Sequence, residues 1–247
     1  MSPMPSRSLS SSNDFSKGSV AGNILRLALP MTVAQIINVL YSVVDRMYIG
    51  RLPDAAGNAL TGLGLTFPIL SIVTAFANLF GMGGSPLFSI ERGRGDYEKA
   101  KTILGNTFAL LIGTGAVLTA ALLLLKKPLL YAFGASDATF PYADGYLTIY
   151  LCGSLFVMIS LGMNQFINAQ GFGRKGMMTV LIGAVANILL DPLFIFVFDM
   201  GVQGAALATI LSQGLSAAWA LSFLRGKKAL IRLEWPYLRL KARLVWQ

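Results

Sequence analysis

Long apolar stretches alternate with short polar segments along most of the chain. A helix needs about 20 mostly apolar residues to cross the roughly 30 Å hydrocarbon layer of a bilayer, and six stretches meet this requirement. The polar segments between them are short, for example RLPDAAGN, GFGRK and the DMG turn. The pattern predicts an all-α polytopic membrane protein with six transmembrane helices, over these ranges: Leu25–Ile49, Leu63–Phe88, Thr102–Leu125, Tyr142–Asn168, Met177–Phe198 and Val202–Leu224.

The composition narrows the function classes. Apolar residues make up 55% of the chain and charged residues 13%, with a mean hydropathy of +0.64. A soluble domain carries about 25% charged residues because its surface faces water, so a soluble core of six buried helices is disfavoured. Histidine is absent and Cys152 is the only cysteine, which excludes internal disulfides and removes the usual ligands of zinc, haem and iron–sulfur sites. No nucleophile–base pair is visible either, so we expect neither an enzyme nor a bound cofactor.

Lysine and arginine are unevenly divided between the two sides of the predicted membrane. Arg46, Arg51, Lys126 and Lys127 fall on one side, and the other sixteen fall on the opposite side. Because Lys and Arg concentrate in cytoplasmic loops, the richer side is predicted to be cytoplasmic, with both termini on it. The net charge of +9 then follows from topology in a cell membrane and requires no nucleic-acid partner. The sixteen are Arg7, Lys17, Arg26, Arg92, Arg94, Lys99, Lys101, Arg174, Lys175, Arg225, Lys227, Lys228, Arg232, Arg239, Lys241 and Arg243.

The two ends of the chain differ from its middle. Residues 1–22 are polar and Ser-rich and lack the apolar core of a signal peptide, so we predict a disordered cytoplasmic tail. Residues 23–224 hold the transmembrane helices, and 225–247 form a basic cytoplasmic linker. Two interpretations of this linker stay open: it binds anionic lipid, or it is a connector that lies near the headgroups.

Two carboxylates lie well inside predicted spans, Asp45 in the first and Asp191 in the fifth. An ionised Asp at the centre of a membrane helix costs about 2.5–3.5 kcal/mol on insertion scales, so it needs a partner, water or a proton. Both residues fall in the outer half of the predicted membrane, which allows them to share one cavity. The alternatives are an interfacial carboxylate beside Arg46 for Asp45 and a helix-end acid near the outer surface for Asp191.

Polar neighbours of these acids favour a functional role. Tyr41 precedes Asp45 by four residues and Asn187 precedes Asp191 by four, so each pair lies on one helical face. Pro192 has no backbone N–H and leaves a carbonyl of the preceding turn without its usual partner, which protein, water or an ion must satisfy in hydrocarbon. Carboxylate, amide and carbonyl oxygens suit Na⁺, and a carboxyl group removed from water also holds a proton well. The residues leave the choice between Na⁺ and H⁺ open.

Three segments resemble the MATE (multidrug and toxic compound extrusion) transporters. The first helix of that family is similar to LALPMTVAQIINVLYSVVDRMYIGRL, and its second-to-third-helix loop resembles GMGGSPLFSIERGRGDYEKAK. Its fourth to sixth helices are similar to FINAQGFGRKGMMTVLIGAVANILLDPLFIFVFDMGVQGAALATILSQ, where LDPLF followed by GVQGAALAT is the most specific part. The resemblance runs from Asn23 to the C-terminus and points to the branch with the DinF-like members.

The resemblance implies a coupling site. Asp45 matches the acid of the first helix, Asn187 and Asp191 match the amide and acid of the fifth, and Thr209 matches a hydroxyl of the sixth. In the family these groups line a cavity of the N-terminal lobe that binds the coupling cation or proton. No other metal site is implied.

The resemblance implies weaker roles for a second group of residues. Tyr41 lies one turn before the acid of the first helix, and Pro30 matches the proline about which that helix bends. Asn164, Asn168 and Gln170 fall near polar positions of the fourth helix. For these three, a packing or capping role and contact with a substrate are both open.

The implied function is antiport, in which amphipathic, often cationic organic compounds or drugs leave in exchange for Na⁺ or H⁺. MATE proteins carry two six-helix lobes, whereas this chain resembles only the first. We therefore expect it to need a second lobe, missing here, or a second copy, and expect no transport by one lobe alone. A flippase for lipid-linked sugars of the same superfamily is an alternative, although no Lys or Arg lies deep in a predicted span to hold a pyrophosphate. A non-transporting, degenerate half-gene membrane protein is another, which the intact acidic residues disfavour.

Overall fold

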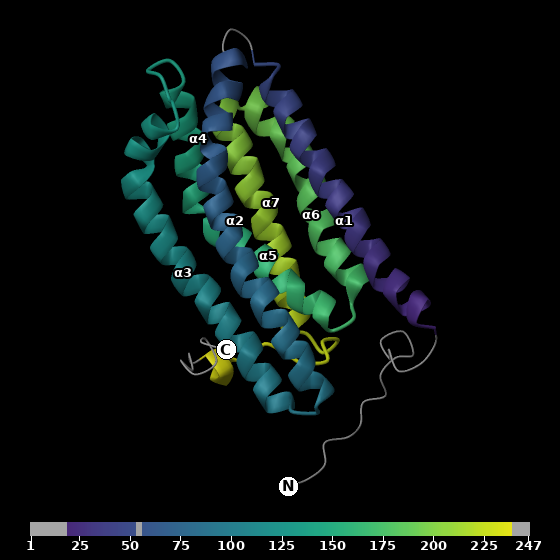
Figure 1. The fold of residues 1–247 in the computed structure, drawn as a ribbon. Coiled ribbons are helices and arrows are strands. Elements are labelled where there is room, and N and C mark those ends of the chain that lie inside the picture. The colour runs from purple at the N-terminus through teal and green to yellow at the C-terminus, as the bar shows by residue number, and fades with distance from the viewer. Residues whose placement is uncertain (1–18, 53–55, 239–247) are drawn as a thin grey trace.

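The computed structural model describes residues 19–52 and 56–238, and within these ranges it contains helices and no strand. Five segments are long and apolar enough to span a membrane: α1, α2, α3, α7 and the continuous α6–η1 segment. The bent pair α4–α5 makes a sixth span (Figure 1). The all-α, six-span fold is confirmed. The elements are α1 (Val20–Ile49), α2 (Ala56–Gly93), α3 (Tyr97–Ala132), α4 (Phe140–Cys152), α5 (Ser154–Ala169), α6 (Gly173–Pro192), the π-helix η1 (Leu193–Val197), α7 (Gly201–Arg225) and the 3₁₀-helix η2 (Trp235–Leu238).

Several helices extend beyond the apolar stretches that predict them. The first turn of α3 reads YEKAK, which is rich in good helix formers, and its N-cap Asp96 accepts a hydrogen bond from the Lys99 N–H at 3.0 Å. α1 begins at Val20, capped by the Ser19 hydroxyl, which accepts from the Gly22 N–H at 3.1 Å. Residues 1–18 of the predicted tail and 239–247 of the predicted linker lie outside the described residues.

The fourth span is broken at Gly153, where α4 and α5 meet at 56°. The Ile210 side chain of α7 occupies the place that a side chain at Gly153 would need, with a carbon 2.0 Å from the Cβ position. The Thr119 hydroxyl of α3 bonds the Leu151 carbonyl at 3.3 Å and the Ser154 hydroxyl at 2.6 Å. A break exposes backbone polar groups that need partners inside a membrane, and Thr119 supplies one.

The fifth span widens after Pro192, where α6 passes into the π-helix η1. Proline lacks the N–H that would continue the regular ladder, and single π-turns occur frequently at functional sites in helices. Gly204 of α7 packs directly on this turn: a Cβ there would lie 2.6 Å from the carbonyl carbon and oxygen of Phe194. The LDPLF and GVQGAALAT motifs are therefore two sides of one close backbone contact.

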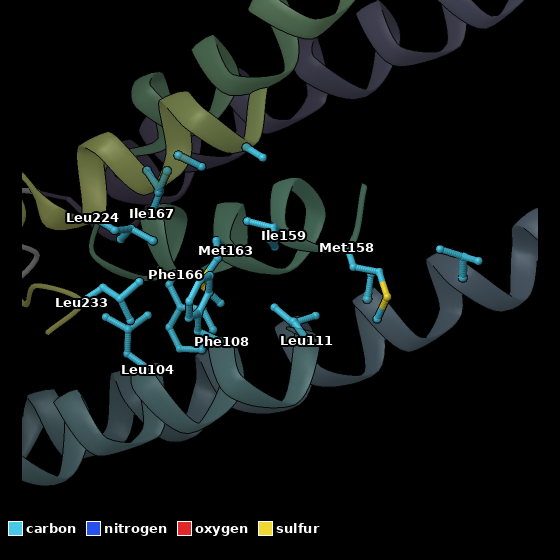
Figure 2. Packing of buried hydrophobic residues seen from close by; sticks show 14 of the residues in the cluster. Leu104, Phe108, Leu111, Met158, Ile159, Met163, Phe166, Ile167, Leu224 and Leu233 are labelled. Carbon is cyan, nitrogen blue, oxygen red and sulfur yellow. The ribbon is translucent and has the colours of Figure 1, made fainter. Parts of the chain in front are cut away.

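The main core lies between α3 and α5, with α2, α4 and the end of α7 around it. Leu104, Phe108 and Leu111 face Met163 and Phe166 across this contact (Figure 2). In lipid, helix association depends on van der Waals packing more than on transfer from water, so this dense cluster holds the bundle together. α1 packs mainly on α6, and its other face exposes large apolar side chains as a lipid-facing helix would, among them Ile24, Leu29, Val39 and Met47.

Most of the Lys and Arg residues predicted to be cytoplasmic and described by the structure gather at one end of the bundle, called the basic end below. It consists of the α2–α3 turn, the α5–α6 turn and the end of α7 (Figure 1). Arg92 joins the first two turns by donating to the Ala169 carbonyl at 3.0 Å. The Gln170 side-chain oxygen accepts the N–H groups of Leu230 and Ile231, at 2.8 and 3.0 Å, and so ties the chain after α7 to the α5–α6 turn.

Candidate functional site

A cavity of about 690 Å³ lies among α1, α2, α4, α5 and α7. Its lining is mixed: aromatic rings, hydroxyls and amides surround a single carboxylate, Asp45, and a single guanidinium, Arg46. Drug-sized ligands occupy cavities of about 300–1,000 Å³, so the space is large enough for one. The lining side chains that the site argument uses are Asn38, Tyr41, Ser42, Asp45, Arg46, Tyr146, Tyr150, Thr209 and Gln213.

The two intramembrane acids meet at the base of this site. Asp45 comes from α1 and Asp191 from α6, which pack against each other. Asp191 has no solvent-exposed surface and Asp45 is 9% exposed. Their carboxyl groups are close enough to interact electrostatically. Two ionised carboxylates at such close range repel strongly where the dielectric constant is low, so a proton or a cation must accompany them.

Asn187 and Thr209 lie beside these acids. The Asn187 amide donates to Asp191 Oδ1 at 3.2 Å, one helical turn away on α6, and to the Thr209 hydroxyl of α7 at 3.5 Å. Asn187 is 1% exposed. The amide thereby fixes the position of the Asp191 carboxyl group and links α6 to α7.

Three oxygens of this cluster are buried without a donor from the described residues: Asp45 Oδ1, Asn187 Oδ1 and Asp191 Oδ2. A buried acceptor without a partner costs about 1–3 kcal/mol, and an ionised one costs more. Three donor-free oxygens beside a hydroxyl are hard ligands of the kind that a small cation takes. The residues present therefore fit a monovalent cation, and a single proton shared by Asp45 and Asp191 would satisfy part of the same need.

The cavity includes residues that were not predicted. Tyr146 and Tyr150 of α4 stack with ring centroids 6.1 Å apart, and both line the cavity together with Gln213 of α7. Spacing by four residues was the available signal, because it joins Tyr146 to Tyr150 and Thr209 to Gln213 on single helical faces, as it joins Tyr41 to Asp45.

Tyr41 lines the cavity, whereas Pro30 and Asn164 do not. Pro30 lies inside α1, which is continuous through it, about four turns from Asp45. Asn164 and Asn168 of α5 instead face Gly176 of α6, where a Cβ would lie 3.2 and 2.1 Å from their side-chain oxygens. The structure brings together Asp45, Asn187, Asp191, Thr209 and Tyr41, and places Asn164 in a helix–helix contact nearer the basic end.

Comparison with known proteins gives a consistent set of relatives. The protein family described as MatE matches residues 30–193. The multidrug export protein MepA of Staphylococcus saprophyticus is 28% identical over 227 residues, which is 91% of this chain and 49% of that protein. MepA of Staphylococcus aureus is 30% identical over 209 residues, which is 85% of this chain and 46% of that protein.

A solved structure described as the outward-facing conformation of a multidrug resistance MATE family transporter of the MOP superfamily has a similar fold. It superimposes with a TM-score of 0.84 and 25% identity, over 92% of this chain and 50% of the other. The chain thus spans about half the length of the relatives it matches.

Proposed function

Because this chain belongs to the MATE family of multidrug efflux transporters, we propose that it is the lobe that couples export to the entry of Na⁺ or H⁺. One observation carries the proposal: a buried pair of carboxyl groups, Asp45 and Asp191, adjoins a cavity of drug size. The exported compounds are amphipathic and often cationic. Stacked tyrosines and one carboxylate in the lining suit an organic cation, which is attracted to aromatic faces.

Coupling follows from the placement of the two acids on different helices. A cation or proton between Asp45 and Asp191 removes their repulsion and favours close packing of α1 on α6, whereas its release favours separation. α1 also lines the cavity through Asn38, Tyr41 and Ser42, so a shift of this helix changes the shape of the cavity. The ion can shift such an equilibrium only by its difference in affinity for the two arrangements.

Transport requires a second wall around the substrate. Alternating access uses two bundles that rock around a site between them, and the chain supplies one six-span bundle. We propose that its partner is a second six-helix lobe or a second copy of the chain. Either arrangement would cover the cavity side of α1 and α2.

The basic end is proposed to face the cytoplasm, because Lys and Arg gather there. We expect single cysteines introduced at Arg94 or Lys175 to react with a membrane-impermeant maleimide only after the cell is opened. The native Cys152 is exposed and is replaced by serine in this background. A cysteine at Lys127, at the opposite end, should react from outside and serves as the control. Labelling of Arg94→Cys in intact cells contradicts the orientation.

The proposed function is tested by ion binding to the purified chain, since this lobe holds the whole acidic cluster. We expect the thermal midpoint in detergent to rise in NaCl relative to choline chloride, or to rise as pH falls if the proton is the coupling ion. A ligand at 100 times its Kd stabilises by about 2.7 kcal/mol.

The Asp191→Asn variant should lose this response. Asp199→Asn is the matched control, because Asp199 is an exposed carboxylate with a φ of 51° that asparagine tolerates. The proposed function would be refuted if the thermal midpoint of the wild type changed with neither Na⁺ nor pH. It would also be refuted if the midpoint of Asp191→Asn responded to them as the wild type does.

A further inference from the structure

The chain that follows α7 is fixed on the bundle rather than trailing from it. Ala229, Ile231 and Leu233 are buried in the main core. The Leu233 N–H donates to the Leu224 carbonyl at 3.0 Å and closes a loop at the end of α7. With the two N–H groups held by Gln170, this segment has a defined conformation. Residues 225–236 are called the basic loop below.

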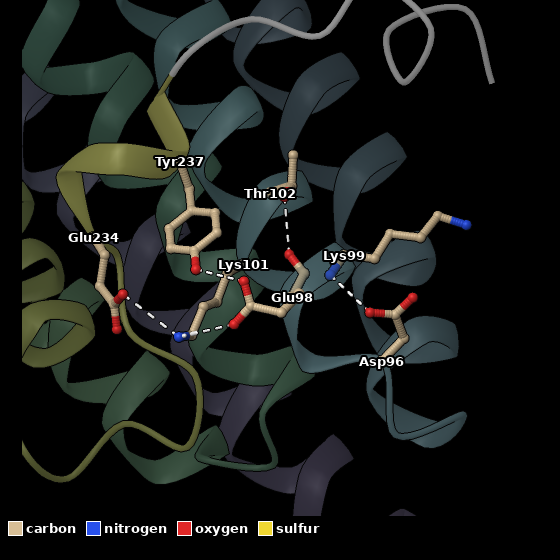
Figure 3. A network of polar contacts seen from close by, with 7 residues as sticks. All are labelled: Asp96, Glu98, Lys99, Lys101, Thr102, Glu234 and Tyr237. Carbon is tan, nitrogen blue, oxygen red and sulfur yellow. Dashed lines mark hydrogen bonds and ion pairs between the residues drawn. The ribbon is translucent and has the colours of Figure 1, made fainter. Parts of the chain in front are cut away.

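Polar contacts on α3 hold the far side of the basic loop (Figure 3). Lys101 pairs with Glu98 and with Glu234, each at 3.5 Å, and the Tyr237 hydroxyl donates to Glu98 at 2.5 Å. This hydrogen bond to the Glu98 carboxylate raises the pKa of Tyr237, so its phenol remains a donor. Gly105 gives the chain room, because a Cβ there would lie 2.2 Å from the Tyr237 carbonyl oxygen.

The two acidic residues of this region, Glu98 and Glu234, both pair with Lys101, so they do not neutralise the basic residues of the loop. Within the described part of the chain, Lys228 and Arg232 have no acidic partner. Burial alternates along residues 229–233: Ala229, Ile231 and Leu233 are buried, whereas Leu230 and Arg232 are half-buried, and Lys228 before them is exposed. The Lys228 side chain is therefore accessible at the surface, and that of Arg232 is partly accessible.

An exposed tryptophan accompanies these charges. The Arg225 guanidinium carbon lies 4.8 Å from the centre of the Trp235 ring, and Trp235 is 72% exposed. A similar pair lies farther up α7, where the Lys175 ammonium is 5.9 Å from the Trp219 ring. Tryptophan is enriched where membrane meets water, because its ring is apolar and its N–H is polar.

The length of α7 places the basic loop at headgroup depth. Its 25 residues span about 38 Å at 1.5 Å per residue, against roughly 30 Å of hydrocarbon and about 40–45 Å with the headgroups included. The end of α7 at Arg225 therefore lies among the headgroups. α2 and α3, with 38 and 36 residues, extend farther than α7 at the basic end (Figure 1).

We propose that the basic loop is a binding surface for anionic phospholipid headgroups. Arg225, Lys228 and Arg232 attract the phosphate and its neighbouring negative charge, and Trp235 inserts its ring at the level of the glycerol. The observations favour lipid over nucleic acid, because the charges form a small patch at headgroup depth beside an exposed indole. The fixed backbone keeps the basic groups together without an ordering cost at each binding event.

Titration with lipid tests this surface directly. The purified chain in neutral detergent is titrated with mixed micelles that contain phosphatidylglycerol or phosphatidylcholine, and tryptophan fluorescence is recorded. We expect tighter binding of phosphatidylglycerol and a loss of that preference as salt is added. Arg225→Gln with Lys228→Gln should weaken phosphatidylglycerol binding about 25-fold, from about fivefold for each basic residue near an anionic surface.

The matched control removes two charges from the opposite end, Arg51→Gln with Lys127→Gln, where both side chains are exposed. This control accounts for lipid that binds elsewhere around the helices. Its affinity for phosphatidylglycerol should stay close to that of the wild type. Equal thermal midpoints without lipid show that both double variants fold. The proposal is overturned if phosphatidylglycerol and phosphatidylcholine bind alike, if both double variants lose affinity equally, or if duplex DNA binds the loop more tightly than phosphatidylglycerol does.

Discussion

Asp45→Asn and Asp191→Asn are each expected to abolish ion-driven export when this lobe is paired with a second one. Each change keeps the shape of the side chain but removes the charge that the ion or proton neutralises. Insertion should not suffer, because the removed carboxylate costs about 2.5–3.5 kcal/mol in a membrane helix. Thr209→Ala should weaken ion dependence only about fivefold, in keeping with about 1 kcal/mol for a neutral hydrogen-bonding group.

The measurement is movement of a fluorescent cationic dye into or out of proteoliposomes under a Na⁺ or pH gradient, with Asp199→Asn as the control that keeps activity. Full export by both Asn variants would remove the acidic pair from the mechanism.

The chain reconstituted by itself is expected to be inactive. Dye movement by the chain alone that disappears with Asp191→Asn would instead identify two copies as the working transporter.

Gly204→Ala is expected to destabilise the lobe by about 1–3 kcal/mol, the usual cost of adding a methyl group to a filled contact. The new Cβ would lie 2.6 Å from the backbone of Phe194 in η1, and a backbone cannot rotate aside as a side chain can. Gly214→Ala is the matched control on the same helix, because its nearest neighbour is the Phe156 ring at 3.8 Å. That change should stabilise by about 0.5–1 kcal/mol, since alanine is the better helix former.

Thermal unfolding in detergent compares the two alanine variants. Opposite shifts of the midpoint are expected, a fall for Gly204→Ala and a rise for Gly214→Ala. A rise for both would mean that α7 and η1 can separate at little cost. In that case the close contact would not hold the segment after Asp191 in place.

The fold and the two membrane acids could be predicted from the sequence, because each involves residues that would be energetically unfavourable in most other structures. An apolar stretch of span length has few stable alternatives to a membrane helix, and a carboxylate such as Asp45 or Asp191 inside one is rarely accidental. Spacing by four then attached Asn187 and Tyr41 to the acids. Thr209 was found only through the resemblance to a family, since threonine in a helix carries no signal of its own.

Other features lacked such a signal. Gly153 at the break contacts Ile210 of α7, and Gly204 of α7 contacts the π-turn after Pro192, so both contacts require knowledge of which helices are neighbours. The role of Gln170 is similar, because its partners lie 60 and 61 residues farther along the chain. For Asn164 the sequence leaves substrate contact and a packing role both open, and its place against Gly176 depends on which helices are neighbours.

The contacts that hold the basic loop on α3 limit when this loop can dock during synthesis of the chain. Glu98 meets Tyr237 across 139 residues and Lys101 meets Glu234 across 133, so all six spans are made before these contacts can form. Until then the Gln170 amide and the sites for Ile231 and Leu233 are open to solvent or to chaperones. The basic end of the lobe is therefore closed only after its last span has been synthesised.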